Sequence, residues 1–141
     1  MSKQVTHLLR IMSRLRSPTG CPWDREQNHK SLIRCLKDET EELIHVIRKG
    51  DIHGLREELG DLLLQVIFHA QLANEAGKFS FNDVVRTITR KLIRRHPHVF
   101  SKRKVHDVAG VLKQWNEIKA KEKKDQRHAR NRRYTAVRSR D

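Results

Sequence analysis

Hydrophobic residues recur every three or four positions along most of the chain, which is the spacing of one face of an α-helix. The alternation typical of β-strands does not occur. The pattern predicts helices over residues 4–16, about 30–49, 53–76 and 82–95, and a last helix from about residue 107. The sequence therefore predicts an all-α protein, a helical bundle of about five helices.

Turn-forming residues separate these predicted helices. Pro18 and Gly20 follow the first helix, Gly50 follows the second, Gly77 follows the third, and Pro97 breaks the chain after the fourth. The third helix carries an apolar stripe wider than one partner helix needs. This width suggests packing within a bundle or at a subunit interface, and we expect oligomerisation to complete the bundle.

Composition agrees with a helical protein and excludes a membrane-spanning one. The 141 residues are 36% hydrophobic, 34% charged and only 5% aromatic. No apolar run approaches the ~18 residues of a membrane span, and residues 1–10 lack the apolar core of a signal peptide. The sequence predicts a soluble, cytoplasmic protein.

The charge is strongly positive and unevenly placed. The chain has 31 Lys and Arg against 17 Asp and Glu, a net charge of +14, and residues 119–141 alone have a net charge of +7. The hydrophobic pattern fades over the same residues. We expect a single domain over residues 1–118 and a basic, partly disordered tail over residues 119–141. A surplus this large implies anionic partners, which are phosphates, nucleic acid or a membrane surface.

Four carboxylates are placed to meet across the predicted hairpin of the second and third helices. Glu39 and Glu42 are three residues apart, as are Glu58 and Asp61, so each pair lies on one helix face. If the chain folds back at Gly50, Glu42 faces Glu58 and Glu39 faces Asp61.

Like charges in a helix seam repel one another, and a hard divalent cation relieves that repulsion. Mg²⁺ prefers carboxylate oxygens, and Mn²⁺ shares this preference. The competing interpretation is an ordinary solvated acidic face. The apolar residues around both pairs and their matching heights in the hairpin favour a metal site.

An acidic metal site within a basic protein suits a phosphate-containing substrate. The metal binds phosphate oxygens, and nearby Lys and Arg side chains neutralise the remaining negative charge of the phosphates. The candidate cations are Lys91, Arg94, Arg95 and Lys119. Position alone slightly favours ordinary surface solvation for these residues.

Beyond the acid pairs, four blocks of sequence resemble the MazG family of nucleoside triphosphate pyrophosphohydrolases, which are all-helical. The blocks are GCPWDREQ at residues 20–27, REELGDLL at 56–63, KLIRRHPHVF at 91–100 and WNEIK at 115–119. The resemblance covers roughly residues 5–122.

The resemblance implies roles for particular residues. The family's metal ligands fall on Glu39, Glu42, Glu58 and Asp61. Its phosphate-binding cations match Lys91 and Arg95, and its aromatic and lysine beside the substrate match Trp115 and Lys119. The implied reaction is Mg²⁺-dependent hydrolysis of a nucleoside triphosphate to a monophosphate and pyrophosphate, in housecleaning of the nucleotide pool. A carboxylate would help to deprotonate the attacking water.

Two features depart from the family. The family carries an EExxE motif that matches residues 38–42. Asp38 replaces its first Glu, but the spacing places Asp38 away from the face of Glu39 and Glu42. Family members often carry two such domains, whereas this chain has one, so we expect a homodimer or a higher homo-oligomer. The basic tail is outside the family pattern.

Two other functions remain open. The chain could be a nucleic-acid-binding module on an inactive MazG-like scaffold, acting through residues 119–141. It could also be a di-iron bundle, since Glu42 and His45 form one Glu-x-x-His motif. That fold needs two such motifs, and Glu58 is followed by Asp61 instead.

Overall fold

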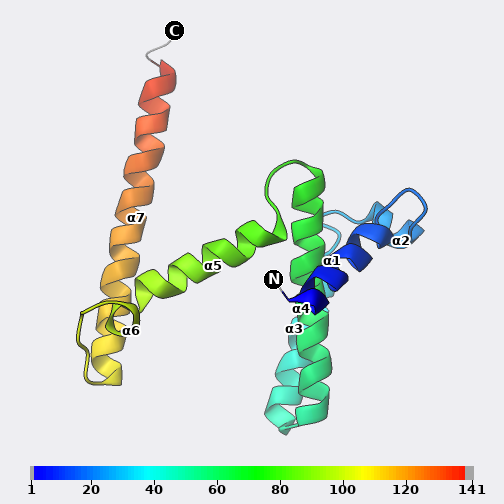
Figure 1. Ribbon diagram of the computed structural model, residues 1–141, viewed down its shortest axis with the longest axis horizontal. Helices are drawn as coiled ribbons and strands as arrows, with labels where there is room; N and C mark the ends of the chain where they lie inside the picture. The colour runs from blue at the N-terminus through cyan, green and yellow to red at the C-terminus, as the bar shows by residue number, and fades with distance from the viewer. Residues whose placement is uncertain (1, 139–141) are drawn as a thin grey trace. The chain divides into compact units, whose positions relative to one another are not determined.

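Helices account for all the regular structure of residues 2–138, which are the residues that the computed structural model describes, with side chains for residues 2–130 (Figure 1). The helices are α1 (Lys3–Leu15), α2 (Pro22–Glu26), α3 (Ile33–Lys49), α4 (Ile52–Glu75), α5 (Phe81–Arg95), α6 (Pro97–Phe100) and α7 (Val108–Arg138). This confirms the predicted all-α fold.

The five long helices correspond to the predicted ones, with boundaries shifted by a few residues. The short helices α2 and α6 replace segments that the sequence assigned to loops. Each begins at a proline, whose fixed φ suits the first helical position and whose missing N–H costs nothing there.

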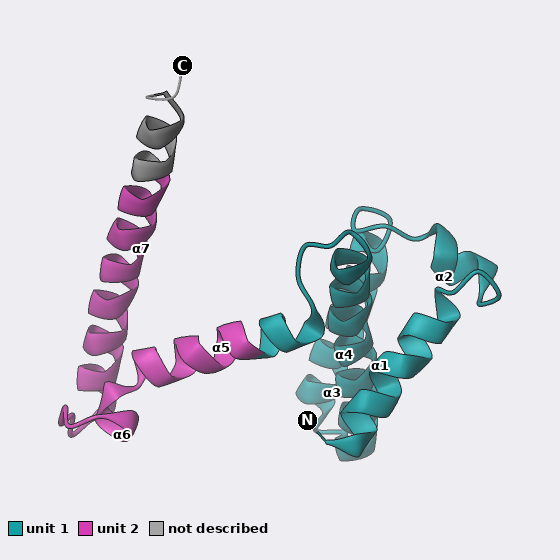
Figure 2. Ribbon diagram, turned by 45° about the horizontal axis from the view of Figure 1, so that its top comes forward, with its two compact units in different colours: residues 1–85 teal, residues 86–141 magenta. Residues whose placement is uncertain are grey.

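The chain forms two compact units, residues 1–85 and residues 86–141, and each is described by itself (Figure 2). α7 continues as a helix to Arg138, through residues that the sequence assigned to a basic tail. The division into a domain over residues 1–118 and a tail over residues 119–141 stays a prediction.

The core of the first unit lies where α1 and the start of α3 pack against α4. Met12, Leu32, Ile67 and Phe68 are almost fully buried there. α3 also packs along α4 as a helical hairpin. The hairpin brings the predicted acid pairs to neighbouring positions.

The connection between α3 and α4 is short and well defined. Gly50 ends α3 with φ 67°, a left-handed conformation that glycine adopts without steric cost. The Asp51 amide donates to the Val46 carbonyl at 3.1 Å, and the Asp51 side chain accepts from the Gly54 amide at 3.0 Å. These bonds fix the register of the two helices.

Among the described residues, no helix is both long enough and apolar enough to cross a membrane.

One arginine joins three parts of the first unit. Arg16, at the end of α1, donates to the Glu75 carboxylate at the end of α4 through Nε at 2.8 Å and Nη2 at 2.7 Å. Its Nη1 donates to the carbonyls of Asp24 and Gln27, beside α2. The hydrogen bond from Arg16 is the main cause of a lowered Glu75 pKa.

We predict that Arg16→Lys lowers the free energy of unfolding by about 1–3 kcal/mol, because lysine cannot satisfy the carboxylate and two carbonyls at once. Chemical denaturation at pH 7 measures this, and Arg10→Lys, on the exposed side of α1, is the matched control. Because folding lowers the Glu75 pKa, its contribution is present above about pH 4.5 and is lost as the pH falls through the folded pKa. An equal effect of Arg16→Lys in strong acid would contradict this account.

Candidate metal centre

Three carboxylates converge on the seam between α3 and α4. Ligand oxygens of Glu39 on α3 and of Glu58 and Asp61 on α4 lie within 4.8 Å of one another. All three residues are partly buried. Glu58 and Asp61 share a face because they are three residues apart on a helix, and the Gly50 turn brings Glu39 opposite them.

Glu42, the fourth predicted ligand, is exposed and lies outside this group of close oxygens. It is nevertheless near, since its negative charge raises the pKa of both Glu58 and Glu39. Its role as a ligand stays a prediction.

The carboxylates destabilise one another's charged forms. Desolvation is the largest cause of a raised Glu39 pKa, followed by the charges of Asp61 and Glu42. Desolvation also comes first in raising the Glu58 pKa, followed by the charges of Glu42, Asp61 and Glu39. Within the first unit, none of the described ion pairs involves Glu39, Glu58 or Asp61, so the unit's own cations do not neutralise this negative charge.

An unsatisfied oxygen supports a bound cation at this place. Glu58 Oε2 is buried and has no hydrogen-bond partner among the described residues. A buried carboxylate oxygen without a partner is costly, and a metal ion is one way to satisfy it. Three carboxylates without nitrogen or sulfur donors suit a hard cation such as Mg²⁺ or Mn²⁺.

Asp38 takes no part in the close group. It is exposed and lies 3.8 Å from the Arg34 guanidinium one turn earlier on α3. The position at which the sequence departs from the EExxE motif therefore faces solvent.

The predicted substrate-binding residues lie in the second unit. Arg95 lies 5.2 Å from the centroid of the Trp115 ring, and its Nη2 donates to Glu122 Oε2 at 2.9 Å. Lys91 is partly buried and Lys119 is exposed. Arg95 and Trp115 thus meet inside this unit, while the carboxylates belong to the other unit.

Glu122 is a residue that the sequence interpretation missed. It also accepts from Arg94 Nε at 2.6 Å, and hydrogen bonds from Arg95 and Arg94 lower its pKa to about 2. The position of Glu122 in the sequence could have identified it, because residues 111, 115, 118 and 122 are spaced so that they lie on one face of α7. A carboxylate on that inner face requires cationic partners.

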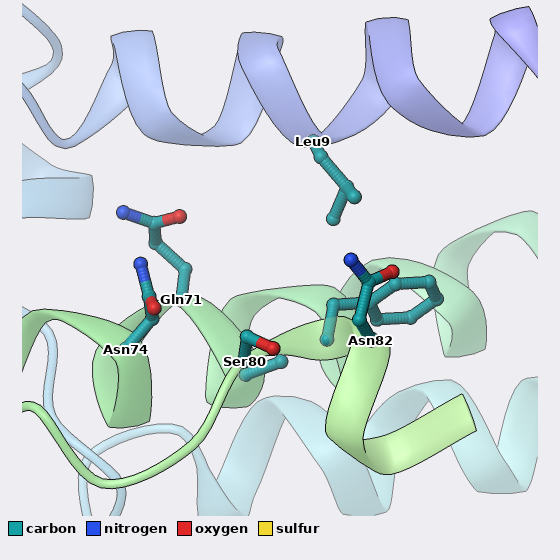
Figure 3. Close-up of a pocket in the computed structure, with 7 residues that line it drawn as sticks. Leu9, Gln71, Asn74, Ser80 and Asn82 are labelled. Atoms are coloured by element: carbon teal, nitrogen blue, oxygen red, sulfur yellow. The ribbon is translucent and has the colours of Figure 1, made fainter. Parts of the chain in front are cut away.

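The first unit also contains a pocket of about 150 Å³ between α1, the end of α4 and the start of α5 (Figure 3). Leu9, Gln71, Asn74, Ser80 and Asn82 line it together with Ala70 and Phe81. None of the predicted site residues lines this pocket, so it stands apart from the carboxylates.

The sequence profile of the MazG nucleotide pyrophosphohydrolase domain matches residues 27–100, which include both acid pairs. The chain belongs to the MazG family. The matched residues contain both α3 and α4, the two adjacent helices that carry the carboxylates.

Several MazG relatives are similar over most of this chain. A Thermotoga maritima protein named nucleoside triphosphate pyrophosphohydrolase/pyrophosphatase MazG is 52% identical, over 87% of this chain and 47% of its own length. The Escherichia coli K12 nucleoside triphosphate pyrophosphohydrolase is 47% identical, over 85% of this chain and 46% of its own. The chain thus spans about half the length of these two relatives.

A crystal structure of a MazG-related protein from Thermotoga maritima is also similar. Its TM-score is 0.67 at 28% sequence identity, and the match covers 82% of this chain and 98% of that one. An all-helical fold therefore recurs in the solved structure of a MazG-related protein.

We predict that Mg²⁺ stabilises the protein at pH 7.5 and loses this effect near pH 4.5. At a free concentration 100 times its Kd, a ligand adds about 2.7 kcal/mol to the stability of the folded state. Raised pKa values let protons displace the cation at a higher pH than ordinary carboxylates would allow. Thermal unfolding with Mg²⁺ or with EDTA measures both effects.

The variant Asp61→Asn distinguishes Mg²⁺ binding at the carboxylates from a general effect of salt on stability. Removing one charge from the cluster should raise the stability of the metal-free protein at pH 7.5 and abolish most of the response to Mg²⁺. The raised carboxyl pKa values also mean that metal-free protein loses stability as the pH rises above about 4.5. An unchanged Mg²⁺ response in Asp61→Asn would show that the ion binds elsewhere.

Proposed function

We propose that the protein is a Mg²⁺-dependent nucleoside triphosphate pyrophosphohydrolase that releases a nucleoside monophosphate and pyrophosphate. The observation that carries this proposal is the cluster of Glu39, Glu58 and Asp61 with the unsatisfied Glu58 oxygen. The names of the relatives support the reaction type. Nucleotide housecleaning in the cytoplasm, where nucleoside triphosphates are made and used, is the role that we propose.

In this proposal Glu39, Glu58 and Asp61 hold the metal, and Glu42 joins them or orients a water beside them. Bound Mg²⁺ would neutralise phosphate oxygens and acidify a bound water. The protein's own contribution is to keep the carboxylates close and partly desolvated before the substrate arrives. A carboxylate of the cluster then accepts the proton of the attacking water.

We propose that Lys91, Arg95, Trp115 and Lys119 contact the substrate. Lys91 and Lys119 have no carboxylate partner among the described residues, so both are available to a phosphate. Arg95 is held between Glu122 and the Trp115 ring, which limits its movement. A pre-positioned guanidinium loses less entropy when it binds a phosphate.

We predict that Asp61→Asn lowers kcat/KM for nucleoside triphosphates at least about 100-fold, because several kcal/mol of charge stabilisation depend on the metal. Monophosphate and pyrophosphate release, measured with excess Mg²⁺ and with chelator, tests this. Glu41→Gln is the matched control: it removes an exposed carboxylate from α3, the other helix of the hairpin, outside the close group of oxygens, and should leave activity within about 2-fold. Full wild-type activity after thorough metal removal would contradict the proposal.

We further propose that the protein forms a homodimer or a higher homo-oligomer. Large apolar side chains on the hairpin helices are strongly exposed in one chain: 41% for Ile44, 58% for Ile47, 50% for Leu59 and 40% for Leu63. Burying these side chains against a second hairpin would complete a four-helix bundle.

We predict a dimer or larger species in light scattering at micromolar concentration. Ile44→Glu combined with Ile47→Glu should shift the protein towards the monomer, because both charges would have to be desolvated at the interface. Lys49→Glu, at the exposed end of the same helix, should not change the mass. A wild-type monomer at tens of micromolar would argue against this proposal.

A further inference from the structure

The outer part of α7 presents a dense and unpaired positive charge. Within residues 119–130, the six basic side chains are all exposed, and none pairs with a carboxylate in the described part of the chain. They are Lys119, Lys121, Lys123, Lys124, Arg127 and Arg130. We call residues 119–130 the basic segment.

The acids of the basic segment do not offset this charge. Glu122 is already bonded to Arg94 and Arg95, so its charge is neutralised from α5. Asp125 is three residues later and lies on the same side of the helix as Glu122. The opposite side therefore offers positive charge to a partner.

Because α7 is a continuous helix here, its geometry places the cations in two rows. Lys123, Arg127 and Arg130 are spaced by four and three residues and form one row, with Lys119 one turn before them. Lys121 and Lys124 lie on the other side of the same stretch. The basic segment is ~18 Å long at 1.5 Å per residue.

The chemistry of the segment selects among anionic partners. Apart from two alanines it has no apolar side chain, so it lacks the apolar face with which amphipathic helices enter a lipid surface. It also lacks the buried aromatic or aliphatic anchors of most protein interfaces. Its one aromatic ring is that of His128, and a single ring does not provide the series of stacking platforms on which successive unpaired bases bind. A duplex backbone, with about one negative charge per 1.7 Å, matches it best.

We propose that the basic segment of α7 binds the phosphate backbone of duplex DNA without sequence preference. The major groove of B-form DNA is about 12 Å wide and admits an α-helix, so the two rows of cations would meet the two strands. The major groove of an RNA duplex is too deep and narrow for this arrangement. This inference does not depend on the proposed hydrolase activity.

Fluorescence anisotropy with a labelled 24-base-pair DNA duplex of arbitrary sequence tests the proposal. Each phosphate contact contributes about −0.9 to the slope of log affinity against log salt. With about five contacts, affinity should fall roughly 500-fold between 50 and 200 mM salt. The triple variant Lys123→Gln, Arg127→Gln, Arg130→Gln should weaken binding at least about 10-fold and reduce the slope by about 3, with hydrolase activity retained.

A matched control variant tests whether DNA binding depends on the position of these cations on α7 or only on the net charge of the protein. Lys30→Gln, Lys49→Gln, Lys78→Gln removes the same three charges from exposed positions of the first unit and should bind DNA within about 2-fold of wild type. Equal losses in both triple variants, or no loss in the first, would overturn the proposal. So would tighter binding to an RNA duplex of the same length or to phosphatidylglycerol vesicles.

Discussion

Mutual repulsion of carboxylates on the α3–α4 seam is the constraint on which the rest of the site depends. Glu39, Glu58 and Asp61 approach one another closely in a partly desolvated position, where each charge makes the next one costlier. The turn at Gly50 and the Asp51 cap hold them there, because they fix how the two helices align. If the hairpin contacts were the only stabilising ones, repulsion would push the carboxylates apart. The free energy of packing the core around Ile67 and Phe68 therefore offsets this repulsion.

The sequence was sufficient to predict the helices and the close carboxylates, because both follow from simple periodicity. Two positions three residues apart share a helix face, and one glycine between two helices sets which residues oppose each other. The same reasoning could not distinguish Glu42 from its neighbours. Whether Glu42 lies inside or beside the close group depends on the crossing of α3 over α4, which no spacing rule specifies.

Other features could not be predicted from the sequence, for different physical reasons. α2 and α6 are single turns, too short for a hydrophobic period to show. Trp23 is 54% exposed, although tryptophan side chains are highly buried on average. The bonds of Arg16 and of Glu122 join residues far apart in the chain, and side-chain partners of this kind are set by tertiary packing alone.

Charge is used in opposite ways in the two units. In the first, unpaired carboxylates are held close and partly buried, which suits a cation. In the second, Glu122 pairs with Arg94 and Arg95 of α5, while the lysines and arginines of residues 119–130 on α7 are exposed to solvent or an anion. The most direct test of the central claim is anomalous diffraction from crystals grown with Mn²⁺. The account predicts a peak within coordination distance of carboxylate oxygens of Glu39, Glu58 and Asp61, and well-ordered carboxylates without such a peak would contradict it.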